Sequence, residues 1–375
     1  MDEQFAREVM SGRKRGLAAR LLRGGLWCFQ WPYRAGVAAK NLTFNIGLRK
    51  PFDARIPVIS VGNLTTGGTG KTPVVAFVAN WFRDAGLKVG LLSRGYKTLT
   101  QATNPKRERG PVNHSPSLTL RVSAANDEKL VLDQLCPGVP HWLSPDRIES
   151  AQRAVSEGCQ LLILDDAFQH RRIHRDLDIV LIDATNPWGY GHCLPRGLLR
   201  EPISALSRAS LVLVTRADLV TPSELTAIRS ELVRMEHVAT VVEVAFRPTG
   251  LLNSSGVTCS FDDFRRSHGS CLAACGIGNP EAFQRSLKHL DLNVSKFIPF
   301  PDHHHFTPDD LVQLAGAAQS ISATSLLVTQ KDLVKIAANE VNGIPIWAVQ
   351  IGVEVLRGAS VLEHHLFGVL NRHGV

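Results

Sequence analysis

The stretch from Val58 to Thr72 is the feature that most constrains the fold of this chain. Its first four residues, Val-Ile-Ser-Val, are mostly apolar and β-branched, as in a strand covered on both faces of a parallel sheet. After Thr72 the apolar residues recur with the period of a helix that ends before Gly86. Pro73 falls in the first turn of that helix, where its missing N–H costs no hydrogen bond. The stretch therefore predicts a strand, a loop and a helix in that order.

The loop between this strand and this helix is rich in glycine and ends in lysine and threonine. Such a loop can turn its backbone N–H groups toward one point, and the helix that follows adds the positive end of its dipole. In this arrangement Lys71 reaches the β- and γ-phosphates of a nucleotide, and the Thr72 hydroxyl ligates Mg²⁺. The first position of the G-x-x-x-x-G-K-[ST] pattern holds Thr65 instead of glycine, yet strand and helix stand where the pattern requires them. The predicted nucleotide-binding residues are Thr65, Thr66, Gly67, Gly68, Thr69, Gly70, Lys71 and Thr72.

Further apolar segments predict a parallel sheet around the first strand. They recur at the spacing of successive βα units and span residues 87–93, 159–164, 179–183, 211–215 and 241–244. We therefore predict an α/β fold with a P-loop NTPase-like, doubly wound, mostly parallel sheet. Ligands of such sheets bind at the carboxyl ends of the strands, where Thr72, Arg94 and Asp165 fall.

Two acidic pairs are candidates for chemistry. Asp165 and Asp166 directly follow the segment 159–164, and a carboxylate at the end of a strand beside a phosphate loop can bind Mg²⁺ or its waters. The other pair, Asp127 and Glu128, opens a predicted helix, where acids are common because of the helix dipole alone. For this second pair, helix capping and a chemical role are both open.

The pattern changes near residue 246 and predicts a second, smaller α/β domain. The strands and the helix expected in it cover residues 270–276, 280–290, 326–329 and 346–351. We thus divide the chain into an N-terminal segment over 1–50, a nucleotide-binding core over 51–245 and this smaller domain over 246–375.

Three consecutive histidines, His303, His304 and His305, follow Asp302 in the second domain. Neighbours in an extended chain point to opposite sides, so the three cannot all ligate one metal ion. A zinc site therefore competes with a single histidine that a carboxylate orients and that works near neutral pH.

Seven cysteines at irregular spacing, without a signal peptide, favour a reducing, cytoplasmic setting. Cys271 and Cys275 form the one close pair, with an alanine-rich interval between them. Because no second pair accompanies them, small buried hydrophobes are favoured over metal ligands.

The first 50 residues hold most of the positive charge. They contain ten Lys or Arg and three Asp or Glu, a net charge of +7, against +8 for the whole chain. Apolar and aromatic side chains alternate with these charges, but no uninterrupted run approaches the roughly 18 apolar residues that span a bilayer. A basic amphipathic segment can lie at the headgroup level of an anionic membrane. A helix packed on the domain and a basic nucleic-acid arm are the alternatives.

The residues after segment 211–215 have the outline of a guanine-reading loop. Thr215-Arg216-Ala217-Asp218 follows the N-K-x-D pattern with Thr in place of Asn and Arg in place of Lys. Because of these departures, the pattern does not establish GTP as the nucleotide.

Taken together, the ordered motifs resemble those of the tetraacyldisaccharide 4′-kinase family, the lipid A kinases. The resemblance extends from about Pro57 to Asp332 and rests on the segments Asn63 to Pro73, Leu92 to Tyr96, Asp165 to His170, Leu199 to Pro202, Gly276 to Pro280 and Pro301 to His304. It implies transfer of the γ-phosphate of ATP, with Mg²⁺, to the 4′-hydroxyl of a tetraacylated glucosamine disaccharide 1-phosphate. The product would be lipid IVA, formed on the cytoplasmic face of the inner membrane.

The resemblance also implies roles for single residues. Asp127 matches the catalytic base and His303 its partner, since a carboxylate held by histidine can accept the proton of a sugar hydroxyl. Asp166 is grouped with them as catalytic, and Thr72 and Asp165 are the expected metal ligands. Other matched positions are Gln169 and His170 around the phosphates, and Tyr96, Glu128, Arg200 and Glu201 as substrate or active-site residues.

The expected partners follow from the same resemblance. They are the acylated disaccharide and an anionic membrane surface, to which the N-terminal segment would bind peripherally; no nucleic acid and no obligate protein partner are expected. Ala167 and Asn126 stand where the family usually has glycine, and the loop over 101–116 is long. A nucleotide-switch ATPase or GTPase and a metal-dependent hydrolase built on His303 to His305 are the competing hypotheses.

Overall fold

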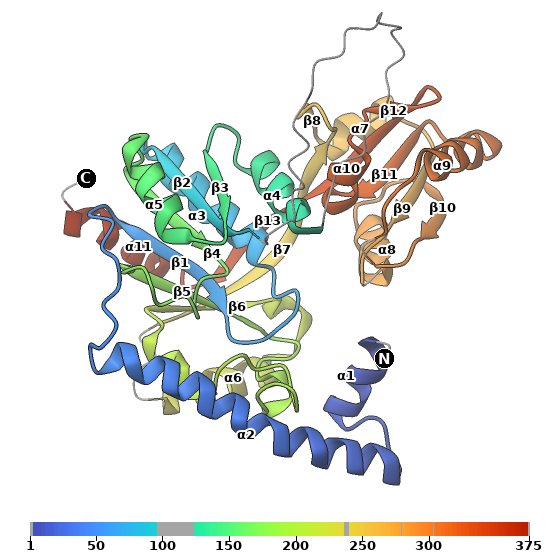
Figure 1. Ribbon diagram of the computed structural model, residues 1–375. Coiled ribbons are helices and arrows are strands. Elements are labelled where there is room, and N and C mark those ends of the chain that lie inside the picture. The colour runs from blue at the N-terminus through green and yellow to red at the C-terminus, as the bar shows by residue number, and fades with distance from the viewer. Residues whose placement is uncertain (1–2, 96–123, 236–239, 279, 303, 374–375) are drawn as a thin grey trace, which may run out of the picture. The chain divides into compact units, whose positions relative to one another are not determined.

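The computed structural model describes residues 3–95, 124–235, 240–278, 280–302 and 304–373 (Figure 1). The chain forms two compact units. The first consists of Met1–Arg94, Cys136–Arg247 and Gly352–Val375, and the second of Gly95–Leu135 and Pro248–Ile351. Two long strands, β7 (Val241–Leu252) and β13 (Ile344–Arg357), each have residues in both units.

These units divide the chain differently from the ranges 1–50, 51–245 and 246–375. Residues 1–50 belong to the first unit, where the long helix α2 (Leu17–Asn45) packs on the core. Residues 95–135 belong to the second, because α4 (Ala124–Leu135) packs against α10 (Gln330–Ile336). The chain then returns through β13, so its last residues belong to the first unit.

The first unit is built on a parallel sheet. Besides β7, its strands are β1 (Val58–Asn63), β2 (Val89–Arg94), β3 (His141–Ser144), β4 (Leu161–Asp165), β5 (Leu177–Asp183) and β6 (Leu211–Thr215). Their order is β3-β2-β4-β1-β5-β6-β7, with neighbouring strands parallel. From β1 the chain winds to β2 and β3, returns to β4 beside β1, and then winds the other way. This reversal confirms the predicted doubly wound α/β sheet, and the loop after β1 lies at the switch point.

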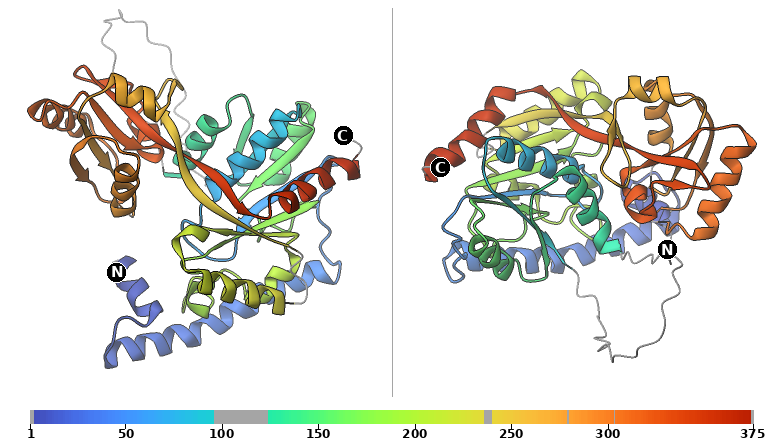
Figure 2. Two further views of the ribbon diagram at one scale, coloured as in Figure 1. Left: turned by 180° about the vertical axis from the view of Figure 1, so that it is seen from behind. Right: turned by 90° about the horizontal axis from the view of Figure 1, so that it is seen from above.

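The helices of the first unit lie around this sheet, except α1 (Glu3–Ser11), which packs on α2 (Figures 1 and 2). They are α1, α2, α3 (Lys71–Asp84), α5 (Arg147–Ser156), α6 (Pro222–Arg234) and α11 (Ala359–His373), with short 3₁₀ turns at Gly189–Gly191, Ile203–Arg208 and Ala217–Leu219. Every residue of β1 is buried, as a strand covered on both faces requires. Helix α3 packs on β1, β2 and β4, and its Phe82 is completely buried.

Helix α2 is a single helix of 29 residues that lies along the first unit. One side packs on the core, where Tyr33 and Lys40 donate to backbone oxygens and Arg171 covers the ring of Phe44. The other side leaves large apolar residues exposed, among them Leu21 at 68% and Phe29 at 70%. Within the described residues, no helix combines the length and the apolar character needed to cross a bilayer.

The second unit holds the remaining strands of the same thirteen-stranded sheet, in which β13 is the neighbour of β7. Besides the two long strands, its elements are α4, β8 (Thr258–Cys259), α7 (Phe261–Ser267), β9 (Cys271–Cys275), α8 (Pro280–His289), β10 (Val294–Pro299), α9 (Pro308–Ser320), β11 (Ser325–Thr329), α10 and β12 (Glu340–Val341). The order β10-β9-β11-β13 is parallel, while β12 runs antiparallel to β13. Cys271 and Cys275 are buried in β9, among the apolar side chains of this unit. A second, smaller α/β domain was predicted over 246–375, and the second unit contains parallel strands and helices of that kind.

Candidate active site

The phosphate loop is the turn between β1 and α3, and its shape depends on glycine. Gly67 and Gly70 have positive φ angles of 115° and 83°, which side chains with a Cβ rarely adopt. A Cβ on Gly70 would also lie 2.1 Å from the ring of Phe246. Glycine is therefore required at Gly70 for its backbone conformation and for the close approach of Phe246.

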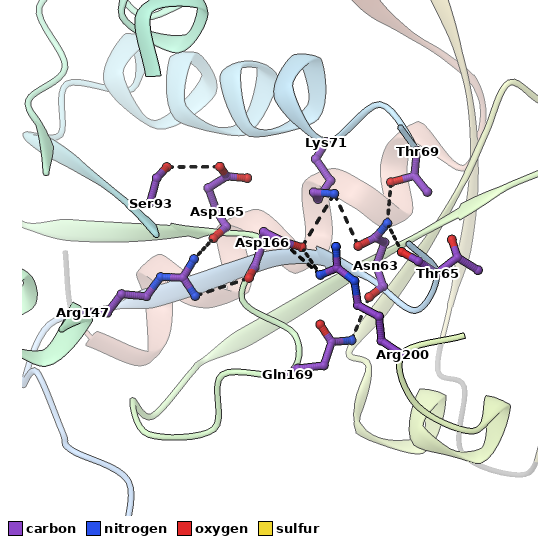
Figure 3. Close-up of polar contacts among 10 residues, drawn as sticks. All are labelled: Asn63, Thr65, Thr69, Lys71, Ser93, Arg147, Asp165, Asp166, Gln169 and Arg200. Carbon is purple, nitrogen blue, oxygen red and sulfur yellow. Dashed lines mark hydrogen bonds and ion pairs between the residues drawn. The ribbon is translucent and has the colours of Figure 1, made fainter. Parts of the chain in front are cut away.

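Asn63 at the end of β1 holds the loop from inside. Its side-chain amide donates to the Thr65 carbonyl at 2.7 Å and to the Thr69 hydroxyl at 3.0 Å. Its side-chain oxygen accepts from the Lys71 ammonium at 3.5 Å (Figure 3). The residue was quoted within the motif but was not predicted as a site residue, although a buried amide at the end of this strand is a usable signal.

Lys71, Asp166 and Arg200 form one charged cluster (Figure 3). The Asp166 carboxylate lies 3.7 Å from the Lys71 ammonium and accepts from Arg200 Nη1 at 2.8 and 2.9 Å. Burial alone would raise the pKa of Asp166, but the charges of Lys71 and Arg200 outweigh it and hold this pKa below its usual range. Two cations and a carboxylate are thus gathered beside the phosphate loop.

Asp165 ends β4, one strand away from the loop. The register pairs it with Val61 of β1, and its carboxylate accepts from the Ser93 hydroxyl at 3.1 Å. Arg147, at the start of α5, donates to the backbone carbonyls of Asp165 at 2.5 Å and Asp166 at 3.3 Å. These contacts fix the turn in which Asp166 adopts a positive φ of 48°. Arg147 was not predicted, because a donor to backbone oxygens leaves no motif in the sequence.

Gln169 and His170 follow in the same turn. The Gln169 side chain donates to the Asn63 backbone carbonyl at 2.9 Å, and the backbone carbonyl of Gln169 accepts from the Lys40 ammonium at 2.9 Å. The pKa of His170 is lowered to about 4, mainly because the ring is buried and to a smaller extent because Arg147 and other positive side chains lie near it. His170 is therefore neutral at pH 7 and adds no positive charge for a phosphate.

Arg200 and Glu201 lie in different environments although they are neighbours. Arg200 reaches the Asp166 cluster, and its N–H donates to the Leu64 carbonyl at 2.7 Å. Glu201 is buried and pairs with Arg208 at 2.5 Å. Glu201 thus supports the local fold in this structure, while Arg200 faces the phosphate loop.

Asp127 lies in the second unit, in the first turn of α4, and is 5% exposed. Its carboxylate is 3.8 Å from the Lys335 ammonium, which lies equally far from Asp332. Asp332 is fully buried and accepts from the Gly276 N–H at 3.1 Å and the Thr329 hydroxyl at 2.6 Å. Glu128, next to Asp127, is exposed. Lys335 and Asp332 were not predicted as partners of Asp127.

The histidine segment separates into residues with different surroundings. His304 Nε2 lies 3.0 Å from the Asp310 carboxylate and its ring stacks on Phe300, while His305 is exposed. His303, the predicted partner of Asp127, lies outside the described residues, as does Tyr96. In the described ranges, no three His, Cys, Asp or Glu side chains gather in a way that could hold a metal ion.

Of the predicted site residues of the first unit, Lys71, Asp166, Arg200 and Gln169 therefore meet around the loop after β1. Known proteins share these sequence features. The profile of the family described as tetraacyldisaccharide-1-P 4′-kinase matches residues 22–371. A tetraacyldisaccharide 4′-kinase of Anaeromyxobacter dehalogenans (strain 2CP-C) is 38% identical over 336 residues, which are 88% of this chain and 86% of that protein. The enzyme of the same description from Geobacter sulfurreducens is 34% identical over 95% of this chain and 96% of its own length.

A solved structure gives the same result. The crystal structure of LpxK from Aquifex aeolicus, described as an "apo" form in complex with ATP, is 28% identical and superposes with a TM-score of 0.69. The match covers 93% of this chain and 99% of that one. The chain belongs to the tetraacyldisaccharide-1-P 4′-kinase family.

Proposed function

We propose that this protein is an ATP-dependent lipid kinase that phosphorylates the 4′-hydroxyl of a tetraacyldisaccharide 1-phosphate in lipid A biosynthesis. Membership of the family supports the reaction and the lipid substrate. The observation that carries the proposal within this chain is the cluster of Lys71, Arg200 and Asp166 beside a glycine loop at the start of a helix. Cations and a helix N-terminus gathered at one point are what a transferring phosphoryl group requires.

The loop residues would bind the triphosphate of ATP. Lys71 and Arg200 now contact a carboxylate, and the more highly charged oxygens of a β/γ-phosphate would compete for both cations. Because the transition state of phosphoryl transfer is loose, catalysis here consists mainly of holding the phosphates in line and balancing their charge.

The residues near the loop fit Mg²⁺. Asp165, Asp166 and Thr72 offer only oxygen donors, which Mg²⁺ prefers, and few protein ligands are usual because the ion keeps its waters and binds the nucleotide. When bound, Mg²⁺ neutralises charge that develops on the phosphates. Asp166 would have to leave Lys71 or Arg200, at least in part, to take up this role.

Asp127 is our candidate for the base that accepts the proton of the sugar hydroxyl. It is buried, and Lys335 restricts the carboxylate from one side at 3.8 Å. A positioned carboxylate of this kind can take a proton as the phosphoryl group arrives. His303 as its partner, and Tyr96, Glu128, His170, Gln169 and Glu201 as active-site residues, are carried by the family resemblance.

The experiment is phosphorylation of tetraacyldisaccharide 1-phosphate in detergent micelles by the purified chain with Mg-ATP. Lys71→Met and Asp127→Ala are compared with wild type and with a reaction that lacks the acceptor. We expect acceptor-dependent product that both substitutions reduce by about 100-fold or more. ATP hydrolysis that is indifferent to the acceptor would instead identify a nucleotide switch, and full activity of Asp127→Ala would remove Asp127 from the role of base.

We further propose that the enzyme binds peripherally to an anionic membrane surface, on the cytoplasmic face of the inner membrane, through the outer side of α2. Leu17, Leu21 and Phe29 are each at least 68% exposed on this helix. Trp27 and Trp31 pack edge to face, and Arg34 lies over the Trp31 ring at 4.8 Å. Exposed apolar and aromatic residues with basic neighbours suit the boundary between headgroups and acyl chains.

Co-sedimentation with vesicles tests this second proposal. The double substitution Leu21→Ser with Phe29→Ser should weaken binding to vesicles that contain anionic lipid by roughly 10-fold or more, since two apolar side chains lose their burial. The control Val233→Ser changes a residue of α6 that is 78% exposed and should leave binding unchanged. Equal binding of all three proteins would refute the role of α2.

A further inference from the structure

The segment Thr215-Arg216-Ala217-Asp218, which has the outline of a guanine-reading loop, contacts the outer side of the phosphate loop. Arg216 follows the last residue of β6 and has a positive φ of 54°. A residue with a side chain adopts this conformation only where its surroundings hold it there, and such residues are frequent at functional sites. The contacts of Arg216 show what holds it.

Two successive residues of this segment bind two successive carbonyls of the phosphate loop. Arg216 Nη2 donates to the Gly68 carbonyl at 2.8 Å, while Nη1 pairs with the Asp183 carboxylate at the end of β5. Thr215 is completely buried, and its hydroxyl donates to the Thr69 carbonyl at 3.1 Å. The planar guanidinium thus connects the loop with the rigid end of a strand in the sheet.

Holding these carbonyls also orients the amides of the loop. In a trans peptide unit the N–H points opposite to the C=O of the preceding residue. When the Gly68 and Thr69 carbonyls point to Arg216 and Thr215, the N–H groups of Thr69 and Gly70 point away from these two residues. The Thr69 N–H donates to the Gly67 carbonyl at 3.1 Å, which tightens the loop, and the Gly70 N–H at the start of α3 is of the kind that binds phosphate oxygens.

Asp218, which would read a base in the guanine pattern, is engaged elsewhere. Arg247 Nη1 lies 2.6 Å from the Asp218 carboxylate, and the same guanidinium contacts Glu354 at 2.8 Å. The positive charge of Arg216 is likewise balanced by Asp183. The contacts of this segment with the nucleotide site therefore run through the loop backbone.

We propose that Arg216 and Thr215 are positioning residues that hold the phosphate loop in its nucleotide-binding shape through the Gly68 and Thr69 carbonyls. The proposal rests on the use of ATP by this chain, as stated above. It assigns to the segment a role in binding the phosphates of the nucleotide and none in the transfer step itself.

The test uses the full-length chain with Arg216→Gln, Arg216→Lys, Thr215→Val and Thr215→Ser. Arg234→Gln is the matched control, because Arg234 forms an exposed ion pair with Glu231 on α6. Initial rates at saturating lipid acceptor give KM for Mg-ATP and kcat separately, calorimetry gives the affinity for Mg-ADP, and thermal unfolding reports on the fold.

Loss of a charge-assisted hydrogen bond to the loop predicts that Arg216→Gln raises KM for ATP roughly 10- to 100-fold, with kcat changed much less. Arg216→Lys should restore only part of the ATP affinity that Arg216→Gln loses, since an ammonium cannot bridge the Gly68 carbonyl and the Asp183 carboxylate as a guanidinium does. Thr215→Val should weaken ADP binding by roughly 3- to 10-fold, and Thr215→Ser should restore it because the hydroxyl remains. Arg234→Gln should match wild type.

Two results would overturn the proposal. One is an unchanged ADP affinity in both Arg216→Gln and Thr215→Val. The other is an equal loss of ADP affinity in Thr215→Ser and Thr215→Val, which would show that the hydrogen bond from the Thr215 hydroxyl is irrelevant. Because calorimetry with ADP needs no acceptor, a chain that binds ADP and fails to phosphorylate the lipid would refute the proposed function and leave this proposal standing.

Discussion

Gly70→Ala offers a quantitative test of how the phosphate loop is built. The added Cβ would meet two ring carbons of Phe246 at 2.1 and 2.3 Å, where ordinary contacts begin at 3.4 Å. Forcing such overlap typically costs about 1–3 kcal/mol, and an alanine at φ 83° adds about 1 kcal/mol. We therefore expect a destabilisation of roughly 2–4 kcal/mol, and a melting temperature lowered by roughly 3–8 °C.

The two costs can be separated by a double-mutant cycle with Phe246→Ala. Removing the ring relieves the overlap but not the backbone conformation, so Gly70→Ala and Phe246→Ala should show a favourable coupling of about 1–3 kcal/mol. Gly67→Ala is the control, because its φ is 115° but no atom lies within 4 Å of a Cβ there. Gly67→Ala should lower the unfolding free energy by about 1 kcal/mol, both alone and in the chain that also carries Phe246→Ala. Additive losses for Gly70→Ala and Phe246→Ala, measured by thermal unfolding, would refute the packing of Phe246 against the loop.

Three further expectations concern the surroundings of the site. The pKa of His170 is lowered to about 4 in the folded chain, so as the pH falls the unfolded chain binds a proton at this residue before the folded chain does. The folded state therefore loses up to roughly 3 kcal/mol of stability between about pH 6.5 and pH 4. His170→Gln should flatten the pH dependence of the melting temperature in that window. Lys335→Met leaves Asp127 and Asp332 buried without their cation and should lower the unfolding free energy by roughly 3–5 kcal/mol, part of which Asp332→Asn in the same chain should restore. Tyr33→Phe removes the hydrogen bond to the Arg200 carbonyl and should lower kcat by roughly 2- to 10-fold while vesicle binding stays unchanged.

The parts of the fold that the sequence predicted are those with a strong local pattern. The strand from Val58, the glycine loop and α3 were expected within a few residues of their observed bounds, as was β4 with the acids at its end. β3 was not expected, because His141–Ser144 is short, half-buried and without alternation. The sequence did contain a signal for α6, where Thr221, Pro222 and Glu224 form a capping box.

The candidate site was predictable to the extent that its residues belong to motifs. Lys71, Asp166 and Arg200 come from three motifs far apart in the chain, and the order of the strands brings them together. Arg147 and Lys335 were missed, since each acts on a partner from a distant segment. Such pairs follow from the packing of helices on the sheet, which a single sequence does not specify.

Arg147 and Arg216 have a common physical role that no motif revealed. Arg147 and Arg216 both donate to backbone carbonyls, at the Asp165–Asp166 turn and at the phosphate loop. A carbonyl is present at every residue, so the acceptor carries no signature in the sequence, and the donor resembles any surface arginine. Yet both guanidinium groups fix a turn that contains a positive φ, at Asp166 and at Gly70 respectively. Motifs therefore identify the groups that meet the nucleotide, whereas the residues that hold those groups in position become recognisable only from the hydrogen bonds of the folded chain.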